Sequence, residues 1–148
     1  MFNEKMQTNI EVWWIYALLS SIFAALTTIF AKIGVENVNS NLATAIRTIV
    51  ILVIAWGIVF VQGNTVNILT IPRKTMIFLL LSGVATGLSW IFYFKALQAG
   101  KALLVAPIDK SSLVLVLLFS VIFLGESLNW KIILGTCLII IGTLVLII

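Results

Sequence analysis

The 148-residue chain is 62% hydrophobic and only 9% charged, and its mean hydropathy is +1.24. Globular domains carry about 25% charged residues, so this composition excludes a soluble protein and indicates an integral membrane protein. The formal charge is +4, but the nine basic residues are spread along the chain and make no patch, which argues against a nucleic-acid partner. With no histidine and five carboxylates, we expect no metal site and no bound cofactor.

Five apolar runs of a length suited to crossing a membrane follow one another along the chain. A helix needs about 20 apolar residues to span the hydrocarbon core, and barrel strands would alternate polar and apolar residues instead. We therefore expect an all-α integral membrane protein. Its five transmembrane helices cover about 12–35, 42–61, 74–98, 102–124 and 130–148, so that residues 1–148 form a single transmembrane domain.

The first predicted helix, 12–35, has small and hydroxyl-bearing residues along one side, which could line an aqueous path or allow close packing. It ends near Lys32, and the second predicted helix, 42–61, carries Arg47 near its start. Ionisable groups within a span usually face a cavity or a charged partner. Lys32 and Arg47 are therefore candidate binding or coupling residues.

The third predicted helix, 74–98, carries four polar or aromatic residues at helical spacing on one face: Thr86, Ser89, Trp90 and Tyr93. Trp90 lies too deep for the aromatic belt at the membrane surface. An aromatic wall with hydroxyl groups could stack on an organic or cationic solute, or it could pack against a neighbouring helix. Both interpretations stay open at this point.

The fourth predicted helix, 102–124, carries adjacent ionisable residues, Asp109 and Lys110, about 11–12 Å from its start at about 1.5 Å per residue. We expect Asp109 to meet a cation from another helix, Lys32 or Arg47, while Lys110 turns to a cavity or reaches the membrane surface. These charges indicate a solute or coupling site, or alternatively a structural ion-pair network. Pro107 either kinks the helix beside them or lies harmlessly in the first turn.

Two pairs of glycines predict helix packing or dimer contacts. Gly83 and Gly87 have the GxxxG spacing that lets helix backbones approach closely. Gly135 and Gly142 recur at a seven-residue interval in the fifth predicted helix, 130–148. The remainder of that helix is mostly Leu, Ile and Val, so we expect it to pack rather than to form a site.

The distribution of basic residues bears on membrane orientation, because such residues collect on the cytoplasmic side. Five spans place the termini on opposite sides. Lys110 lies too deep to count, and the other eight basic residues then divide equally. The N-terminal side has Lys5, Arg73, Lys74 and Lys131, and the other side has Lys32, Arg47, Lys95 and Lys101. Either another feature fixes one orientation, or the chain inserts both ways and two opposite copies pair as an inverted repeat.

Five segments stand in a familiar order along the chain: 23–36 (FAALTTIFAKIGVE), 41–48 (NLATAIRT), 82–98 (SGVATGLSWIFYFKALQ), 105–113 (VAPIDKSSL) and 123–126 (FLGE). With the glycine-containing last helix, they resemble the EamA-type proteins of the drug/metabolite transporter superfamily. The resemblance is closer to the short, single-repeat members with five helices. It covers nearly the whole chain from the first predicted helix onward.

This resemblance implies one half-repeat of a transporter. Larger relatives have ten helices, in two five-helix repeats of opposite orientation, and move metabolites, amino acids or related solutes by alternating access. A single repeat should therefore pair, and the balanced basic residues favour an antiparallel homodimer with the solute site between the copies. Substrates vary across the superfamily, and 106–110 (APIDK) fits the short members better than the long ones, so no substrate residue is carried over.

We therefore expect a secondary transporter subunit in a bacterial or archaeal cytoplasmic membrane, and not an enzyme, because the sequence shows no catalytic constellation. The alternatives are a non-transporting accessory membrane protein and a fixed-orientation half that needs a different five-helix partner. The candidate binding or coupling residues are Lys32, Arg47, Thr86, Ser89, Trp90, Tyr93, Asp109 and Lys110.

Overall fold

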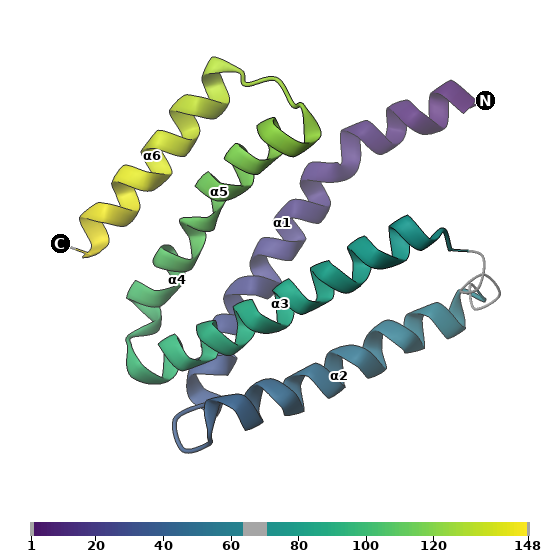
Figure 1. The fold of residues 1–148 in the computed structure, drawn as a ribbon. Coiled ribbons are helices and arrows are strands. Elements are labelled where there is room, and N and C mark those ends of the chain that lie inside the picture. The colour runs from purple at the N-terminus through teal and green to yellow at the C-terminus, as the bar shows by residue number, and fades with distance from the viewer. Residues whose placement is uncertain (1, 64–70, 148) are drawn as a thin grey trace.

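The computed structural model describes residues 2–63 and 71–147, with side chains described for 12–63 and 71–146. These parts of the chain contain helices and turns and no strand (Figure 1). The helices are α1 (Phe2–Gly34), α2 (Ser40–Val61), α3 (Arg73–Ala99), α4 (Ala102–Lys110), α5 (Ser112–Phe119) and α6 (Trp130–Ile147), and a π-helical turn, η2 (Ser120–Leu124), follows α5.

Four helical stretches are long and apolar enough to cross a membrane: Val12–Gly34, Ser40–Val61, Arg73–Ala99 and Ala102–Leu124. A fifth apolar stretch, Trp130–Leu146, is shorter. At about 1.5 Å per residue it is about 25 Å long, close to the lower limit for a span. The expected all-helical membrane protein is thus confirmed, while the fifth crossing stays a prediction. Helix α1 begins at Phe2, earlier than the apolar run that predicted it.

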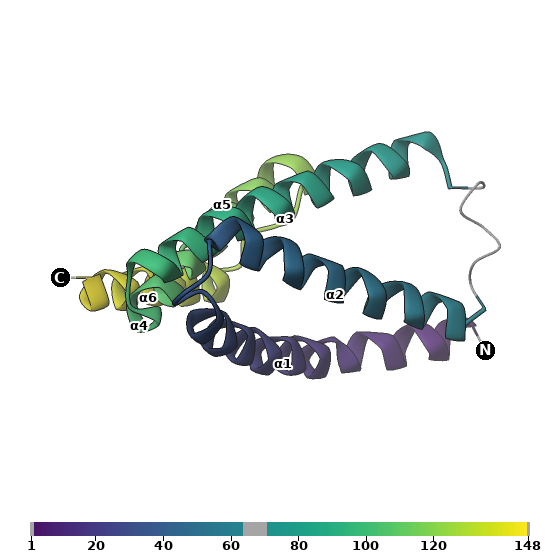
Figure 2. The same ribbon diagram turned by 90° about the horizontal axis from the view of Figure 1, so that it is seen from below.

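The only buried core in the described part of the chain lies at one end of the helices. It consists of Ala31, Val35, Phe94 and Leu97, where the end of α1 meets the end of α3. Figure 1 shows α1, α2 and α3 converging at this end and diverging toward the other, and Figure 2 shows α3 separating from α1 and α2 in the same direction. We refer to these as the convergent end and the divergent end.

Short turns hold the convergent end together. The side chain of Asn39 caps α2, because its Oδ1 accepts hydrogen bonds from the backbone N–H of Asn41 at 2.9 Å and of Leu42 at 3.4 Å. This cap satisfies two of the free amide groups at the start of a helix and fixes where α2 begins. Gly100 separates α3 from α4, and its N–H bonds the carbonyl oxygen of Ala96 at 2.8 Å.

The predicted continuous helix over 102–124 is interrupted. Helix α4 ends at Lys110, and α5 begins at Ser112. At the junction, the backbone N–H of Ser111 donates to the carbonyl oxygen of Ile108, and the N–H of Val114 donates to that of Ser111. Donor and acceptor are therefore three residues apart, as in a 3₁₀-helix, instead of four. Pro107 lies inside α4, beyond its first turn, and leaves one carbonyl oxygen of the preceding turn without its helical N–H partner. The interpretation of Pro107 as a first-turn residue is therefore wrong.

The surface of the chain is far larger than that of a soluble protein of the same mass. It exposes 12291 Å², against about 7,500 Å² expected for a folded monomer of 16.3 kDa. Large hydrophobic side chains are exposed along every long helix. In a membrane protein, lipid or another membrane-embedded chain covers such surface.

Candidate functional site

Lys32 joins α1 to the end of α3. Its ammonium donates hydrogen bonds to the carbonyl oxygens of Leu97 at 2.6 Å and of Gly100 at 2.8 Å. The last carbonyl groups of a helix lack intrahelical partners and carry partial negative charge, so a cation is favoured there. In the opposite direction, the side-chain amide of Gln98 on α3 donates to the carbonyl oxygens of Val35 at 3.2 Å and Val38 at 3.0 Å, which follow α1. Lys32 therefore holds two helices together at the convergent end.

Arg47 joins α2 to α3 through an aromatic face. Its guanidinium carbon lies 3.2 Å from the centroid of the Trp90 ring and 5.6 Å from that of Phe94. Trp90 also meets Tyr93 edge to face, with ring centroids 5.5 Å apart. The predicted aromatic wall of α3 exists, but the cation on it belongs to the protein itself.

The hydroxyl groups predicted on the same face of α3 have different surroundings. The Tyr93 hydroxyl lies 2.8 Å from the Thr28 hydroxyl of α1, which gives a third contact between helices near the convergent end. Thr86 instead donates to the carbonyl oxygen of Ser82 in its own helix at 2.8 Å. Ser89 lines a cavity described below. The structure therefore keeps Ser89 and Tyr93 together at one cavity, whereas the Thr86 hydroxyl is bonded within its own helix.

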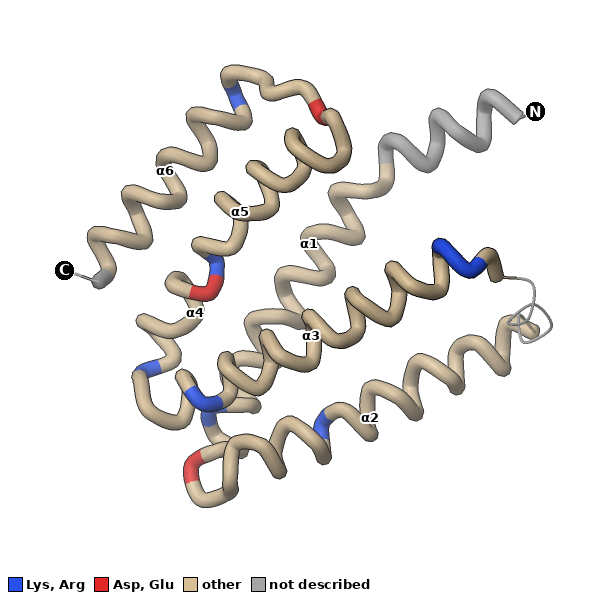
Figure 3. The backbone as a smooth tube through the Cα atoms, in the orientation of Figure 1, with Lys and Arg blue, Asp and Glu red and all other residues tan. Residues whose placement is uncertain are grey.

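Asp109 pairs with its neighbour in sequence rather than with another helix. Its carboxylate lies 3.5 Å from the Lys110 ammonium, at the junction of α4 and α5 that Figure 3 marks in red and blue. The expected partners, Lys32 and Arg47, are engaged with carbonyl groups and with Trp90 instead. The expectation of an interhelical ion pair is therefore wrong within this chain. A carboxylate is not the only partner for a cation within a span, because the carbonyl groups at helix ends and the faces of aromatic rings also stabilise cations.

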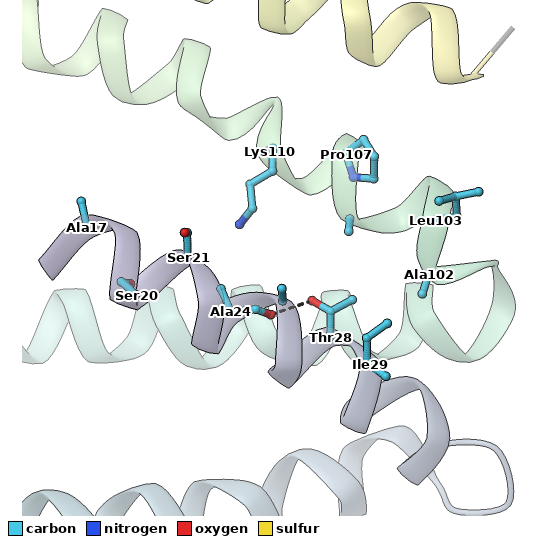
Figure 4. Close-up of a pocket in the computed structure, with 12 residues that line it drawn as sticks. Ala17, Ser20, Ser21, Ala24, Thr28, Ile29, Ala102, Leu103, Pro107 and Lys110 are labelled. Atoms are coloured by element: carbon cyan, nitrogen blue, oxygen red, sulfur yellow. Dashed lines mark hydrogen bonds between the residues drawn. The ribbon is translucent and has the colours of Figure 1, made fainter. Parts of the chain in front are cut away.

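Two cavities flank this charged pair. The α3–α4 cavity, of about 310 Å³, is lined by Asp109 together with Ser89 and Tyr93. The α1–α4 cavity, of about 730 Å³, is lined by Lys110 and Pro107 on one side and by small residues of α1 on the other (Figure 4). The adjacent charges thus face different cavities, and the structure brings three predicted residues, Ser89, Tyr93 and Asp109, to one of them.

A third cavity, of about 400 Å³, lies between α1 and α2 and is lined by Arg47, Phe94, Thr27 and apolar neighbours. Sequence reasoning missed Phe94 and Gln98, although signals for both exist. Phe94 follows Trp90 by one helical turn and therefore shares its face. Gln98 is a polar residue at the end of a predicted span, where carbonyl groups need partners.

The predicted packing glycines make no close helix contact within the described chain. A Cβ atom built on Gly83, Gly87, Gly135 or Gly142 would meet no atom within 4 Å outside its own helix backbone. Their role in a dimer contact stays a prediction. Among the described residues, no group of three or more His, Cys, Asp or Glu side chains could hold a metal ion.

Comparison with known proteins agrees with this architecture. The model of the EamA-like transporter family matches residues 11–148. A Sinorhizobium sp. protein described as an uncharacterized transporter in the cobO 3' region is 51% identical over 136 residues, which cover 92% of this chain and 96% of the relative. An uncharacterized protein of Methanocaldococcus jannaschii is 29% identical over 132 residues, covering 89% and 93% of the two chains. No solved structure matches significantly. The chain is an integral membrane protein and belongs to the EamA-like transporter family.

Proposed function

We propose that this protein is a subunit of a secondary transporter that moves a small organic solute or metabolite by alternating access as an antiparallel homodimer. The membership in a transporter family supports transport, and the name of the Sinorhizobium relative points the same way. The bacterial relative also supports a place in the cytoplasmic membrane. The proposal goes further in naming the solute class, the cycle and the dimer.

The observation that carries the proposed cycle is the one-sided convergence of the helices. In the described residues, the side-chain hydrogen bonds that join α1 and the turn after it to the end of α3 and its cap run between residues 28–38 and residues 93–100. Toward the other end α1 and α3 diverge (Figures 1 and 2). In the proposed cycle, the convergent end is the closed end of the chain, and this conformation is one of the two that alternating access requires.

An antiparallel pair would convert this asymmetry into a transport cycle. In two oppositely inserted copies, the convergent end of one lies beside the divergent end of the other. Two identical copies would make the two membrane faces equivalent, so a cavity open to one face requires the two copies to adopt different conformations. When the two copies exchange their conformations, the opening of the shared cavity moves from one membrane face to the other, and no additional domain is needed.

The orientation of the C-terminus tests the homodimer directly. Fusions to a periplasmic reporter and to a cytoplasmic reporter should both be active if the chain inserts both ways. A matched pair of variants, Asn37→Arg and Ser127→Arg, adds a positive charge at opposite ends of the spans. Each variant alone should favour one orientation and lose cross-linked dimer, and co-expression should restore the dimer. A wild-type C-terminus found on one side only would refute dual insertion and favour a different partner chain.

Reconstituted vesicles test transport. Efflux of a labelled metabolite mixture from vesicles containing the protein should exceed that from vesicles containing the Lys32→Met variant, which lacks the bonds at the convergent end. The Asp109→Asn variant removes the carboxylate from the α3–α4 cavity while keeping its shape. Unaltered transport by this variant would remove Asp109 from the mechanism.

A further inference from the structure

The α1–α4 cavity has the size and lining of a ligand site. Its volume of about 730 Å³ falls in the range of small-molecule pockets, about 300–1,000 Å³. Small side chains form most of its wall, among them Ala17, Ala24 and Ala106. One residue stands out from this apolar surface, because Lys110 is the only charged residue among the described ones that line it.

The Lys110 ammonium is aimed into this cavity. Figure 4 shows its side chain extending from α4 toward α1. Two of the three hydroxyl groups that line it already donate to backbone carbonyl oxygens, Ser21 to Leu18 at 2.7 Å and Thr28 to Ala24 at 3.0 Å, and the third, Ser20, is neutral. The strongest donor offered to a ligand is therefore the ammonium. Its carboxylate neighbour, Asp109, lies 3.5 Å away and lines the other cavity.

The charge balance within the spans is positive. In the described part of the chain, Arg47 lies on Trp90 and has no carboxylate within ion-pair distance, so it does not share Asp109 with Lys110. Charge in an apolar membrane interior needs a compensating group. A cationic solute would be repelled by Lys110. Asp109 accepts one of the three N–H donors of the ammonium, and a neutral apolar solute would leave the others unused. An anion satisfies both the charge and the hydrogen-bonding capacity.

We propose that the α1–α4 cavity binds an amphipathic organic anion. Its carboxylate or phosphate group lies at Lys110, and its apolar part lies along the small side chains of α1 and α4. Because this names the solute class of the proposed transporter, it rests on that function. The shared chemistry, an anionic group on an apolar body, is met both by soluble metabolites and by anionic lipids.

A single cysteine in the cavity tests the charge selectivity. Cys137 is the sole cysteine of the sequence, so Ser21→Cys in a Cys137→Ala background gives one reactive thiol inside the cavity. We expect anionic sulfonatoethyl methanethiosulfonate to react faster, relative to the cationic trimethylammonium-ethyl reagent, than it does with a free thiol. Lys110→Gln should lower that rate ratio by about fivefold or more, and Lys110→Arg should keep it. Lys101→Gln, which removes a cation outside the cavity lining, is the matched control.

Protection of the same thiol identifies the ligand class. Octanoate and octyl phosphate should slow labelling with either reagent, whereas octanol and octylammonium at equal concentration should not. In nanodiscs, protection by phosphatidylglycerol but not phosphatidylcholine would identify a lipid as the source, and protection by octanoate alone would identify a soluble anion. Equal protection by octanol, or a rate ratio that Lys110→Gln leaves unchanged, would overturn the proposal.

These measurements are separable from the proposed function. Labelling needs a folded cavity but no transport, and the thermal unfolding of each variant shows whether it is folded. Anion selectivity in a protein that moves no solute would refute the transporter proposal alone. Transport without anion selectivity would refute the assignment of this cavity alone.

Discussion

The guanidinium of Arg47 lies 3.2 Å above the Trp90 ring, so a charged group of α2 is held on an aromatic face of α3. A cation–π contact of this kind contributes about 0.5–2 kcal/mol, with the larger values where water is excluded. A double-mutant cycle of Arg47→Gln and Trp90→Leu should give a coupling energy of about 1 kcal/mol in detergent unfolding. Trp56→Leu, which removes an exposed tryptophan from α2, is the control and should show no coupling with Arg47→Gln.

Replacing Lys32 should loosen the convergent end. Lys32→Met keeps the apolar stem but leaves the carbonyl groups of Leu97 and Gly100 without the ammonium. Hydrogen bonds to charged groups contribute about 1.5–3 kcal/mol, so the midpoint of thermal unfolding should fall clearly. Lys95→Met, which removes another basic residue near the end of α3, should change it little. Equal midpoints for the two variants would contradict the assigned contact.

The hydrogen bond between Thr28 and Tyr93 should couple α1 to α3 measurably. Tyr93→Phe removes one hydroxyl of the 2.8 Å pair, and Thr28→Val removes the other. The coupling energy should be about 0.5–1.5 kcal/mol, as for neutral hydrogen bonds. Tyr16→Phe alters a tyrosine that is 69% exposed and serves as the control. Additive effects of Tyr93→Phe and Thr28→Val would show that the two hydroxyl groups do not interact.

Hydropathy predicted the apolar helices well because lipid imposes a length and forbids unpaired backbone groups. It could not predict which helix faces meet, because the rotation of each helix depends on its neighbours. For this reason the stack of Arg47 on Trp90 and the pair of Asp109 with Lys110 emerge only from the structure. The sequence offered Pro107 as a possible kink but did not place the interruption at Ser111, because the mean hydropathy of 102–124 is high enough for one continuous span.

Gly100 should not tolerate a side chain. A Cβ atom there would lie 3.1 Å from Cγ2 of Val105 and 3.3 Å from the carbonyl oxygen of Ala96. The side chain of Val105 can move, but the backbone of α3 cannot move without disturbing the end of that helix. Gly100→Ala should therefore lower the unfolding midpoint, whereas Gly34→Ala, with nothing within 4 Å, should not. Equal stability of the two variants would show that the turn adapts at no cost.

Gly87 distinguishes packing within one chain from packing between copies. A Cβ atom on Gly87 would meet nothing within 4 Å, so the single chain leaves room for a larger residue at that position. If Gly83 and Gly87 form a dimer contact, as their spacing predicts, Gly87→Leu would separate two closely packed backbones. We expect this variant to keep the unfolding midpoint of the monomer but to lower the cross-linked dimer fraction severalfold. Gly57→Leu, at another open glycine, provides the comparison. An undiminished dimer would exclude this face of α3 from the interface and direct attention to Gly135 and Gly142 on α6.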